Sequence, residues 1–316
     1  MSTGEAREAV PPASDLRRPL SGRAAGFALF LAALWGGNPV AIKSGLDDAP
    51  PLRLGWMRFV LGTVFVLIWA LLTRQSFRVR RHEWLPLLGL GILFTTQLAF
   101  MNVGQDRTTA GHAVIITSTF PLWTGVFAHF LVPGDRLSMG RVLGTLVAYG
   151  GVVVVFSGSL DGESGLFGDF LLVVSAMLLG ARQVFLSQTS QGIAIHKLLL
   201  AQSLVGVATF IVASALTESA PYVWTWELAL ALLYQGIVIA GFGFLGNTWL
   251  LQRFLPSRVA AMQLSTPVFG VLLSGLILDE PLGLELVVGL ALVVAGSVLT
   301  QREARLLAGV GSRSRQ

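Results

Sequence analysis

The chain lacks cysteine and carries little charge. None of its 316 residues is Cys, and 12% are Asp, Glu, Lys or Arg, whereas a soluble domain carries about 25% charged residues. Without cysteine, disulfides, thiol nucleophiles and cysteine-ligated metal sites are excluded. With so few charges, the surface of a soluble globule of this length lacks the polar groups it needs. A disulfide-stabilised secreted domain, a thiol enzyme and an ordinary soluble protein are therefore excluded.

Buried carboxylates and paired histidines are also missing. No Asp or Glu lies near the middle of a long apolar run, and the four histidines, at positions 82, 112, 129 and 196, have no metal-ligand spacing. We therefore expect no metal and no cofactor. Proton-coupled carriers commonly use buried carboxylates, so only His112 is left to couple a solute to protons near neutral pH. The pattern favours facilitated diffusion or exchange, without coupling to protons.

What the chain does contain is a series of long apolar segments. Hydrophobic residues make up 53% of the sequence, and the mean hydropathy is +0.71. A helix needs about 20 apolar residues to cross about 30 Å of hydrocarbon. We therefore predict an all-α membrane protein with ten transmembrane helices. The predicted spans are residues 24–44, 52–73, 84–104, 109–131, 139–157, 166–187, 196–216, 227–251, 258–278 and 283–300.

A segment of the chain occurs twice. Residues 121–151 read PLWTGVFAHFLVPGDRLSMGRVLGTLVAYGG, and residues 267–296 read PVFGVLLSGLILDEPLGLELVVGLALVVAG. With a one-residue gap, four pairs align: Pro121 with Pro267, Asp135 with Glu280, Gly144 with Gly289, and Gly151 with Gly296. A second set of pairs shares one constant offset, and it comprises Gly36 with Gly180, Val40 with Val184, Arg58 with Gln202 and Gly62 with Gly206. The whole chain is therefore predicted to be an internal duplication.

The aligned glycines of the repeated segment predict close helix packing. Gly144 and Gly151 are seven residues apart, as are Gly289 and Gly296, so each pair lies on one helix face. Small residues let helices approach closely in lipid. We expect the fifth and tenth predicted helices to pack through these glycines and to support the interface between the two repeats.

The distribution of basic residues predicts the orientation. With the N-terminus in the cytoplasm, 17 of the 22 Lys and Arg residues fall in inside segments, and Lys43, Arg53 and Arg107 fall outside. Positive charge collects on the cytoplasmic side of membrane proteins. Five spans in each half is an odd number, so the halves run in opposite directions, with Asp135 inside and Glu280 outside. Such an inverted repeat places a solute site between the halves, near the middle of the membrane.

The predicted domains follow from this arrangement. We expect a disordered cytoplasmic tail at residues 1–23 with no cleavable signal peptide, a first five-helix repeat at 24–157 and a periplasmic linker at 158–165. The second, inverted repeat covers residues 166–300, and residues 301–316 form a second cytoplasmic tail.

Two motifs add to the repeat. The first span contains LWGGNPVAIKSG (residues 34–45), and PPLRLGWMRF (residues 50–59) leads into the second. With the duplicated segment, they make the chain resemble the EamA branch of the drug/metabolite transporter superfamily, over residues 24–300. The resemblance implies a ten-helix carrier of small organic solutes, similar to the amino-acid exporters of that family. Residues 133–136 read Pro-Gly-Asp-Arg, where the family usually has a Leu-Gly-Glu-Arg-like turn.

Polar residues inside the apolar runs are the candidate substrate-binding residues. A buried polar group in a membrane is costly unless it has a partner or faces water. Ser and Thr can instead bond to their own helix backbone, and Asn and Gln can bond between helices, so both alternatives stay open. The candidates are Asn38, Gln97, Asn102, His112, Ser118, Gln235, Asn247, Gln263 and Ser265.

Two tryptophans and two prolines are further candidates. Trp35 and Trp123 lie near the middle of their predicted spans, where an indole ring can stack on a substrate or pack in the core. Pro121 and Pro267 also lie within spans. Proline removes a backbone hydrogen bond and kinks a helix, so these positions predict either a hinge for gating or a static bend.

Two arginines lie within spans, Arg58 and Arg182. Each is close enough to a membrane surface for its side chain to reach the interface, which is the usual arrangement. Arg58 also matches the family's arginine at the head of the second span, which suggests structural pairing. Binding of a substrate carboxylate is the alternative for both residues.

The leading functional hypothesis is a bacterial inner-membrane exporter of amino acids, including aromatic or hydrophobic ones. Two inverted repeats would alternate access to one site. A proton-coupled exporter of drugs or cations is the main alternative. A membrane scaffold and an intramembrane enzyme are less favoured, because the chain has no soluble output domain, no HExxH, no GxSxG and no intramembrane carboxylate pair. The expected partners are a small solute and the lipid bilayer, without nucleic acid, and we expect a monomer.

Overall fold

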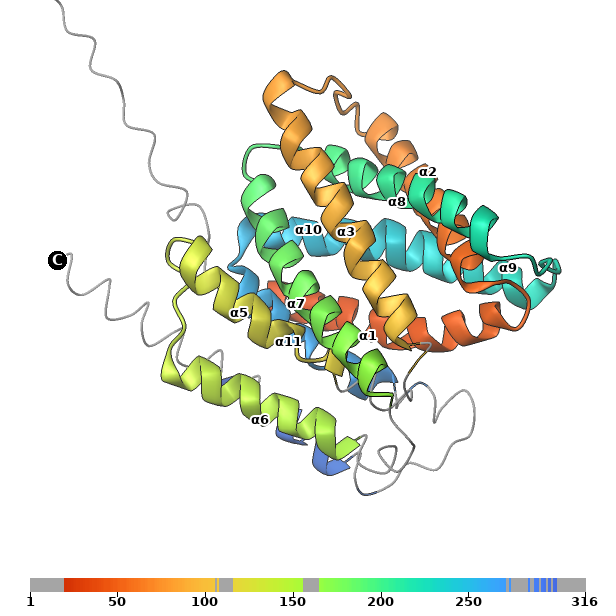
Figure 1. Ribbon diagram of the computed structural model, residues 1–316. Coiled ribbons are helices and arrows are strands. Elements are labelled where there is room, and N and C mark those ends of the chain that lie inside the picture. The colour runs from red at the N-terminus through yellow and green to blue at the C-terminus, as the bar shows by residue number, and fades with distance from the viewer. Residues whose placement is uncertain are drawn as a thin grey trace, which may run out of the picture.

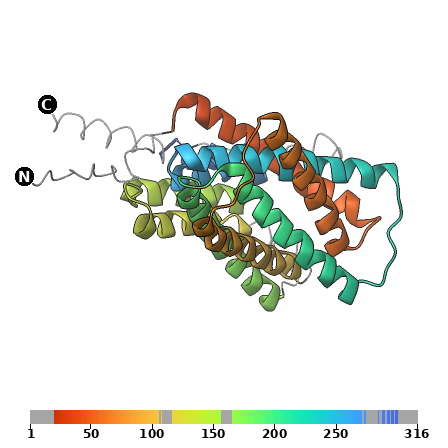
Figure 2. The same ribbon diagram turned by 90° about the horizontal axis from the view of Figure 1, so that it is seen from above.

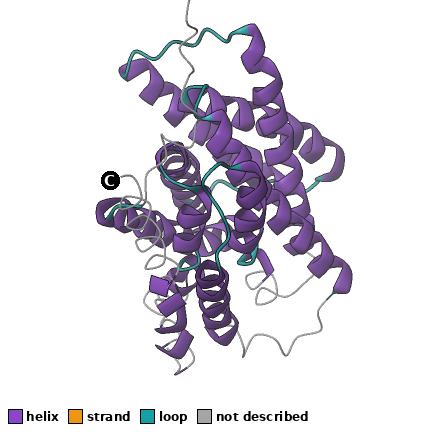
Figure 3. Cartoon of the chain, turned by 90° about the vertical axis from the view of Figure 1, so that its left-hand side faces the viewer, coloured by secondary structure: helices purple, strands orange, loops and turns teal. Residues whose placement is uncertain are grey.

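The computed structural model describes residues 20–105, 107, 116–155, 165–270 and 273, and within the last part of the chain residues 284, 287–289, 291–293, 295–296 and 298–299. Over these residues the regular secondary structure is helical, apart from one isolated bridge residue, as Figure 3 shows. The elements are α1 (Gly22–Leu46), α2 (Pro51–Leu72), η2 (Arg81–Glu83), α3 (Trp84–Gln105), α5 (Phe120–Leu131), α6 (Met139–Val155), α7 (Leu166–Thr189), α8 (Ile195–Thr217), α9 (Trp226–Leu233), η4 (Tyr234–Gly243), α10 (Phe244–Arg253) and α11 (Pro256–Gln263). The predicted all-α class is confirmed.

Among the described residues, five helices are long and apolar enough to cross a membrane. They cover Pro51–Leu72, Arg81–Gln105, Leu166–Thr189, Ile195–Thr217 and Trp226–Arg253. Each matches a predicted span to within a few residues. Two shorter apolar helices, Phe120–Leu131 and Met139–Val154, fall within two further predicted spans.

The helix starts follow simple capping chemistry. The hydroxyl of Ser21 accepts a hydrogen bond from the Ala24 amide at the start of α1, at 3.3 Å. Pro51 is the first residue of α2, a position at which the missing proline N–H is not needed. The carboxylate of Glu218, at the end of α8, accepts the next two amides of α2, from Leu52 at 2.6 Å and Arg53 at 3.0 Å. One end of α2 is thereby joined to the end of α8.

Helices from the two halves of the sequence pack together in one bundle. α2 packs along α8 and η4, and α3 packs along α7 and α8 (Figure 1; Figure 2). Glycines allow the close contacts. A Cβ on Gly62 would lie 2.7 Å from Cβ of Ala240, and one on Gly91 would lie 2.7 Å from the side chain of Val205.

The predicted glycine packing of α6 is confirmed. A Cβ added to Gly151 would lie 2.6 Å from the carbonyl oxygen of Gly289, and one added to Gly296 would meet the backbone of Gly144 and Ala148. α6 therefore packs directly against the helical residues near the C-terminal end of the described chain. Figure 1 shows α6 at the edge of the bundle, beside these residues in blue.

One predicted span contains a widened turn. The long helix Trp226–Arg253 comprises α9, the π-helical segment η4 and α10 without interruption. The hydrogen bonds of a π-helical segment span five residues instead of the four of an α-helix, and such segments often occur at functional sites. It rotates the helix face that follows it, so the direction of side chains in α10 differs from that of a continuous α-helix.

Two predicted spans are interrupted rather than continuous. Residues 118 and 119 form a turn before α5, and residues 264 and 265 form a turn between α11 and the helical residues 266–270. Pro121 is therefore near the start of a helix, not in the middle of one. The cause is the proline of each segment, which cannot donate the backbone hydrogen bond of the turn before it.

Candidate functional site

A buried polar cluster joins α3 to α7. Nε2 of Gln97 donates to Oγ of Ser175 at 3.1 Å, and that hydroxyl donates to the carbonyl oxygen of Gln97 at 3.0 Å. Nη1 of Arg182 donates to Oε1 of Gln97 at 3.2 Å. All three residues are buried. Gln97 therefore binds both Ser175 and Arg182, and it holds the arginine inside the bundle.

Arg182 lies among aromatic rings. Its guanidinium carbon is 4.8 Å from the ring centroid of Phe94 and 5.5 Å from that of Phe244. Aromatic faces attract cations, and the attraction grows when water is excluded. The half-buried Trp35 lies next to Phe244, with 6.4 Å between ring centroids. The cluster thus combines one cation with an aromatic wall.

Three side-chain amides form a closed ring between α7, α10 and α11. Gln183 donates to Gln263 at 3.2 Å, Gln263 donates to Asn247 at 2.8 Å, and Asn247 donates to Gln183 at 3.0 Å. Each carboxamide gives one hydrogen bond and accepts one. The ring is buried, and it satisfies these groups in an apolar environment where an unpaired amide is costly.

A second buried arginine lies between α2 and η4. Nη1 of Arg58 donates to Oε1 of Gln235 at 3.3 Å, and Nε2 of Gln235 donates to the carbonyl oxygen of Ala41 at 3.0 Å. Two turns earlier in α1, the carbonyl oxygen of Leu34 accepts the hydroxyl of Tyr234 at 2.6 Å. Two successive residues of η4, Tyr234 and Gln235, therefore bind backbone carbonyl oxygens of α1. The π-helical segment directs both side chains toward that helix.

The two predicted hinge segments bring together the predicted serines and prolines. The amide of Thr119 donates to the carbonyl oxygen of Ile116 at 3.0 Å, and the amide of Ser265 donates to that of Met262 at 3.3 Å. These bonds span three residues and mark a tightened turn just before Pro121 and Pro267. Ser118 and Ser265 are both buried at these turns.

The remaining predicted site residues are dispersed. Asn38 is half-buried on α1. Asn102 is half-buried near the end of α3, and no hydrogen bond of its side chain is recorded within the described residues. Trp123 is half-buried on α5, where its backbone and Cβ lie against Gly180 of α7. His112 lies outside the described residues.

Sequence reasoning did not identify Gln183, Ser175 and Tyr234 as part of the polar clusters. Gln183 carried a usable signal, because it is an amide inside an apolar run and follows Arg182 directly. Ser175 carried little signal, since a serine in a membrane helix usually bonds to its own backbone. Within the described residues, no group of three His, Asp or Glu is placed to hold a metal ion.

A charged cluster joins the two halves at one end of the bundle. Asp135 is 1% exposed, and its carboxylate accepts Nη1 of Arg141 at 2.7 Å. It also accepts the amide of Ser257 at 3.2 Å and the hydroxyl of the same residue at 2.5 Å. Ser257 is in the first turn of α11, so Asp135 caps that helix. The Pro-Gly-Asp-Arg turn uses Gly134 at a φ of 81° to direct the carboxylate there.

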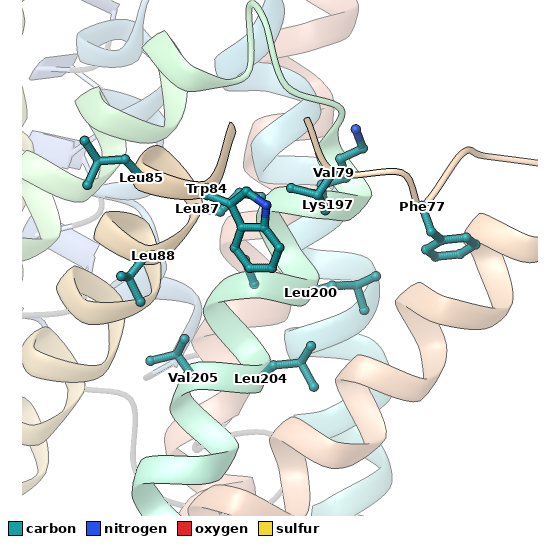
Figure 4. Close-up of a pocket in the computed structure, with 11 residues that line it drawn as sticks. Phe77, Val79, Trp84, Leu85, Leu87, Leu88, Lys197, Leu200, Leu204 and Val205 are labelled. Carbon is teal, nitrogen blue, oxygen red and sulfur yellow. The ribbon is translucent and has the colours of Figure 1, made fainter. Parts of the chain in front are cut away.

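The described part of the surface has an apolar groove between α3 and α8 (Figure 4). Its volume is about 670 Å³, and Trp84, Leu88 and Leu204 are among its lining residues. Lys197 is at its edge, with its ammonium 2.9 Å from Glu83. None of the predicted site residues lines this groove. The buried polar clusters, not the groove, are therefore the candidate solute site.

A bundle of membrane-length apolar helices with hydrogen-bonded amides and arginines in its interior defines a polytopic membrane protein with an internal polar site. The profile of the EamA-like transporter family matches residues 22–157 and 166–302. The chain therefore belongs to the EamA-like transporter family, and it is a membrane transporter.

Curated relatives agree with this assignment. The chain is 29% identical over 287 residues to the "Probable amino-acid metabolite efflux pump" of Escherichia coli (strain K12), and the match covers 85% of this chain and 91% of that protein. It is 22% identical over 272 residues to the "Uncharacterized transporter YoaV" of Bacillus subtilis (strain 168), with 85% and 93% coverage. A solved crystal structure superposes with a TM-score of 0.77 at 19% identity, covering 88% of this chain and 98% of that one. This last likeness shows the fold alone.

Proposed function

We propose that this protein exports amino acids or closely related metabolites across a bacterial inner membrane. The observation that carries the proposal is the set of buried polar clusters on α3, α7, η4, α10 and α11. They include Gln97, Gln235, Asn247 and Gln263 of the predicted site. The neutral amides offer hydrogen bonds, and Phe244 and Trp35, next to the Arg182 that Gln97 binds, offer an apolar wall. An amino acid with an apolar side chain needs this combination. The relatives named as amino-acid metabolite efflux pumps support this solute class.

The proposed architecture is ten membrane helices in two inverted repeats, residues 24–157 and 166–300, with a periplasmic linker at 158–165 and cytoplasmic tails. Two observations support it. The family profile matches two ranges that coincide with these halves. Gly36 lies against residues 269 and 270, while Gly180, its partner in the repeat, lies against residues 123 and 124. The contacts of one half are thus reproduced by the equivalent residues of the other.

The proposed mechanism is alternating access. The turns before Pro121 and Pro267 interrupt the two helices that contact Gly180 and Gly36, so a change at either turn moves a helix end past the other half. Asp135 closes one end of the bundle by joining Arg141 to Ser257. Its partner in the repeat, Glu280, lies outside the described residues. We propose that opening the Asp135 contact exposes the site to the cytoplasm.

Membrane orientation is tested with single cysteines, because the native chain contains none. We expect a cysteine at position 136, which is exposed beside the buried Asp135, to react with a membrane-impermeant thiol reagent from the cytoplasmic side. A cysteine at position 280 should react from the periplasmic side. Reaction of both from the same face would contradict the inverted repeat.

Transport is tested by uptake into proteoliposomes of phenylalanine, leucine, threonine, a polyamine and a cationic drug, with and without a pH gradient. Saturable amino-acid uptake that does not need the gradient supports a facilitative amino-acid exporter. Uptake of the cationic drug alone would replace the solute class proposed here. A strict need for the pH gradient would favour the proton-coupled alternative and make His112 the residue to substitute.

A further inference from the structure

Four residues of the bundle have buried side-chain atoms without a hydrogen-bond partner in the described part of the chain. These atoms are Oδ1 of Asn38, Nε of Arg58, Nε of Arg182, and both Oε1 and Nε2 of Gln202. Gln202 is fully buried. Buried polar groups in native proteins nearly always have a partner, so each exception requires an explanation.

The internal repeat relates these four residues to one another. Asn38 and Arg182 occupy equivalent positions, as do Arg58 and Gln202, at the same constant offset that relates Gly36 to Gly180. The other buried atoms of this kind belong to Arg141 and Arg258, at the Asp135 end of the bundle. The repeat therefore places the four residues at two pairs of matching positions, one member of each pair in each half. A solute site shared by the two halves would produce this pattern.

The two arginines do not pair with each other in the repeat, but they make similar contacts. Arg58 is on the second membrane helix of the first half and donates to Gln235 from the second half at 3.3 Å. Arg182 is on the first membrane helix of the second half and donates to Gln97 from the first half at 3.2 Å. In both cases the acceptor is a neutral carboxamide oxygen on the third long helix of the opposite half.

An aromatic pair separates the two guanidinium groups. Arg58 is 4.9 Å from the ring centroid of Phe59, and Arg182 is 4.8 Å from that of Phe94. The two rings are in edge contact, with 5.2 Å between centroids. Both cations therefore border one apolar wall and belong to a single cluster.

Within the described residues, neither of these two charges is neutralised by a carboxylate. Among the described residues, the ion pairs join Arg141 to Asp135 and Lys197 to Glu83, and no carboxylate pairs with Arg58 or Arg182. A guanidinium has five N–H donors, and the recorded hydrogen bonds use one on each. A buried cation without an anion is unfavourable unless a ligand supplies the opposite charge. A carboxylate is the anion whose geometry matches the guanidinium, through two parallel hydrogen bonds.

We propose that Arg58 and Arg182 are the counter-charges for the carboxylate of the transported solute, and that Asn38 and Gln202 bind its neighbouring polar groups. This inference rests on the proposed function and narrows the solute class to carboxylates with an apolar or aromatic side chain. Phe94, Phe244 and Trp35 provide the wall for that side chain. Because Arg58 belongs to the first half and Arg182 to the second, a carboxylate that passes between the halves meets a cation on each side.

The test uses the full-length protein in lipid nanodiscs and three probes of similar shape. L-Phenylalanine has a carboxylate and an amine, 3-phenylpropionate has the carboxylate alone, and phenethylamine has the amine alone. Binding is measured by titration of tryptophan fluorescence for the wild type and for Arg58→Gln, Arg182→Gln and the exposed-residue control Arg78→Gln. We expect the wild type and the control to bind both carboxylates at least about tenfold more tightly than phenethylamine. Each buried-arginine variant should lose that preference.

Two further measurements keep the result interpretable. Arg58→Lys and Arg182→Lys keep the charge, so they should retain part of the carboxylate preference even if the Gln variants fold poorly. The melting temperature of each ligand-free variant is compared with that of the wild type. Arg182→Gln should lower it no more than Arg78→Gln does. A large fall would show that Arg182 is a structural residue whose partners lie within the protein.

The outcomes separate this inference from the proposed function. Binding of 3-phenylpropionate that depends on Arg58 and Arg182, without amino-acid flux in proteoliposomes, would support the carboxylate site and overturn amino-acid export. Phenylalanine flux with unchanged KM in both Gln variants would overturn the carboxylate site and leave export standing. Binding of none of the probes by the wild type would overturn the site as proposed here.

Discussion

Thr119 and Ser265 make the same hydrogen bond at equivalent positions of the internal repeat. Each side-chain hydroxyl donates to the carbonyl oxygen three residues earlier, Thr119 to Ile116 and Ser265 to Met262, and both distances are 2.7 Å. Each hydroxyl precedes a proline by two residues. In each helix the proline interrupts the series of backbone hydrogen bonds, and the hydroxyl binds a carbonyl oxygen in the turn just before it. Both helices are therefore interrupted in the same way, by a proline that follows a hydroxyl-bearing residue.

Replacing either proline by alanine should slow transport. Pro121→Ala and Pro267→Ala restore an N–H donor and let the helix continue through the turn, so the hinge stiffens. We expect the transport rate in proteoliposomes to fall by about tenfold without loss of folded protein, as hinge substitutions in gated proteins do. Pro256→Ala is the matched control, because Pro256 is the first residue of α11 and its missing N–H is not needed. Equal rates in all three variants would argue that the bends are static.

The amide ring should behave as one unit. Asn247→Leu leaves an acceptor on Gln183 and a donor on Gln263 unpaired, and we expect a loss of about 1–3 kcal/mol for each group. Replacing Gln183, Asn247 and Gln263 together by Leu should cost less than the sum of the single replacements, because no orphan group remains. Reversible unfolding in detergent measures both. Asn102→Leu is the control and should change stability little, because the Asn102 side chain makes no hydrogen bond within the described residues. If the losses of stability of the three single replacements simply add up in the triple variant, the amides do not form a closed ring.

The crossing of α7 with α5 should not tolerate a methyl group. A Cβ on Gly180 would lie 2.8 Å from Cβ of Trp123 and 2.8 Å from the amide nitrogen of Thr124. Overpacking of this kind costs about 1–3 kcal/mol, so Gly180→Ala should lower the melting temperature. Gly36→Ala should do the same at the equivalent crossing. Gly26→Ala is the control, since nothing lies within 4 Å of its added Cβ. A melting temperature for Gly180→Ala equal to that of Gly26→Ala would disprove the close contact.

Removing the charge of Asp135 should weaken the joint between the halves. Asp135→Asn leaves Arg141 without its buried ion-pair partner, and breaking such a pair by removing one member costs about 3–5 kcal/mol. The double variant Asp135→Asn with Arg141→Gln should recover part of this loss, because the orphan charge is gone. Thermal unfolding measures the difference, with the exposed Asp47→Asn as control. If the double variant is no more stable than Asp135→Asn, the ion pair of Asp135 and Arg141 does not stabilise the contact between the halves.

The helical class and most helix positions could be predicted from the sequence, because they depend on local properties. Runs of apolar residues fix where a helix can cross a bilayer, and five predicted spans match observed helices closely. The glycine pairs of the repeated segment also predicted a contact correctly, since Gly151 meets Gly289. Each of these features needs only the period of a helix and the size of a side chain.

The candidate site could be predicted only in part. Gln97, Gln235, Asn247 and Gln263 were identified as buried polar residues because polarity within an apolar run is a local signal. Their partners were not identified, because a hydrogen bond across the bundle depends on how each helix is rotated and on the widened turn at η4. Gln183 was missed for this reason, although it closes the amide ring.

The sequence by itself determined that this protein is a helical membrane transporter with two related halves, because length, hydropathy and self-similarity need no knowledge of contacts. Only the tertiary structure decided that Pro121 and Pro267 follow breaks rather than lie within continuous helices. It also decided that Arg58 and Arg182 point at neutral amides of the opposite half. Side-chain direction depends on helix rotation and crossing, and these are set by packing between segments that lie far apart in the chain.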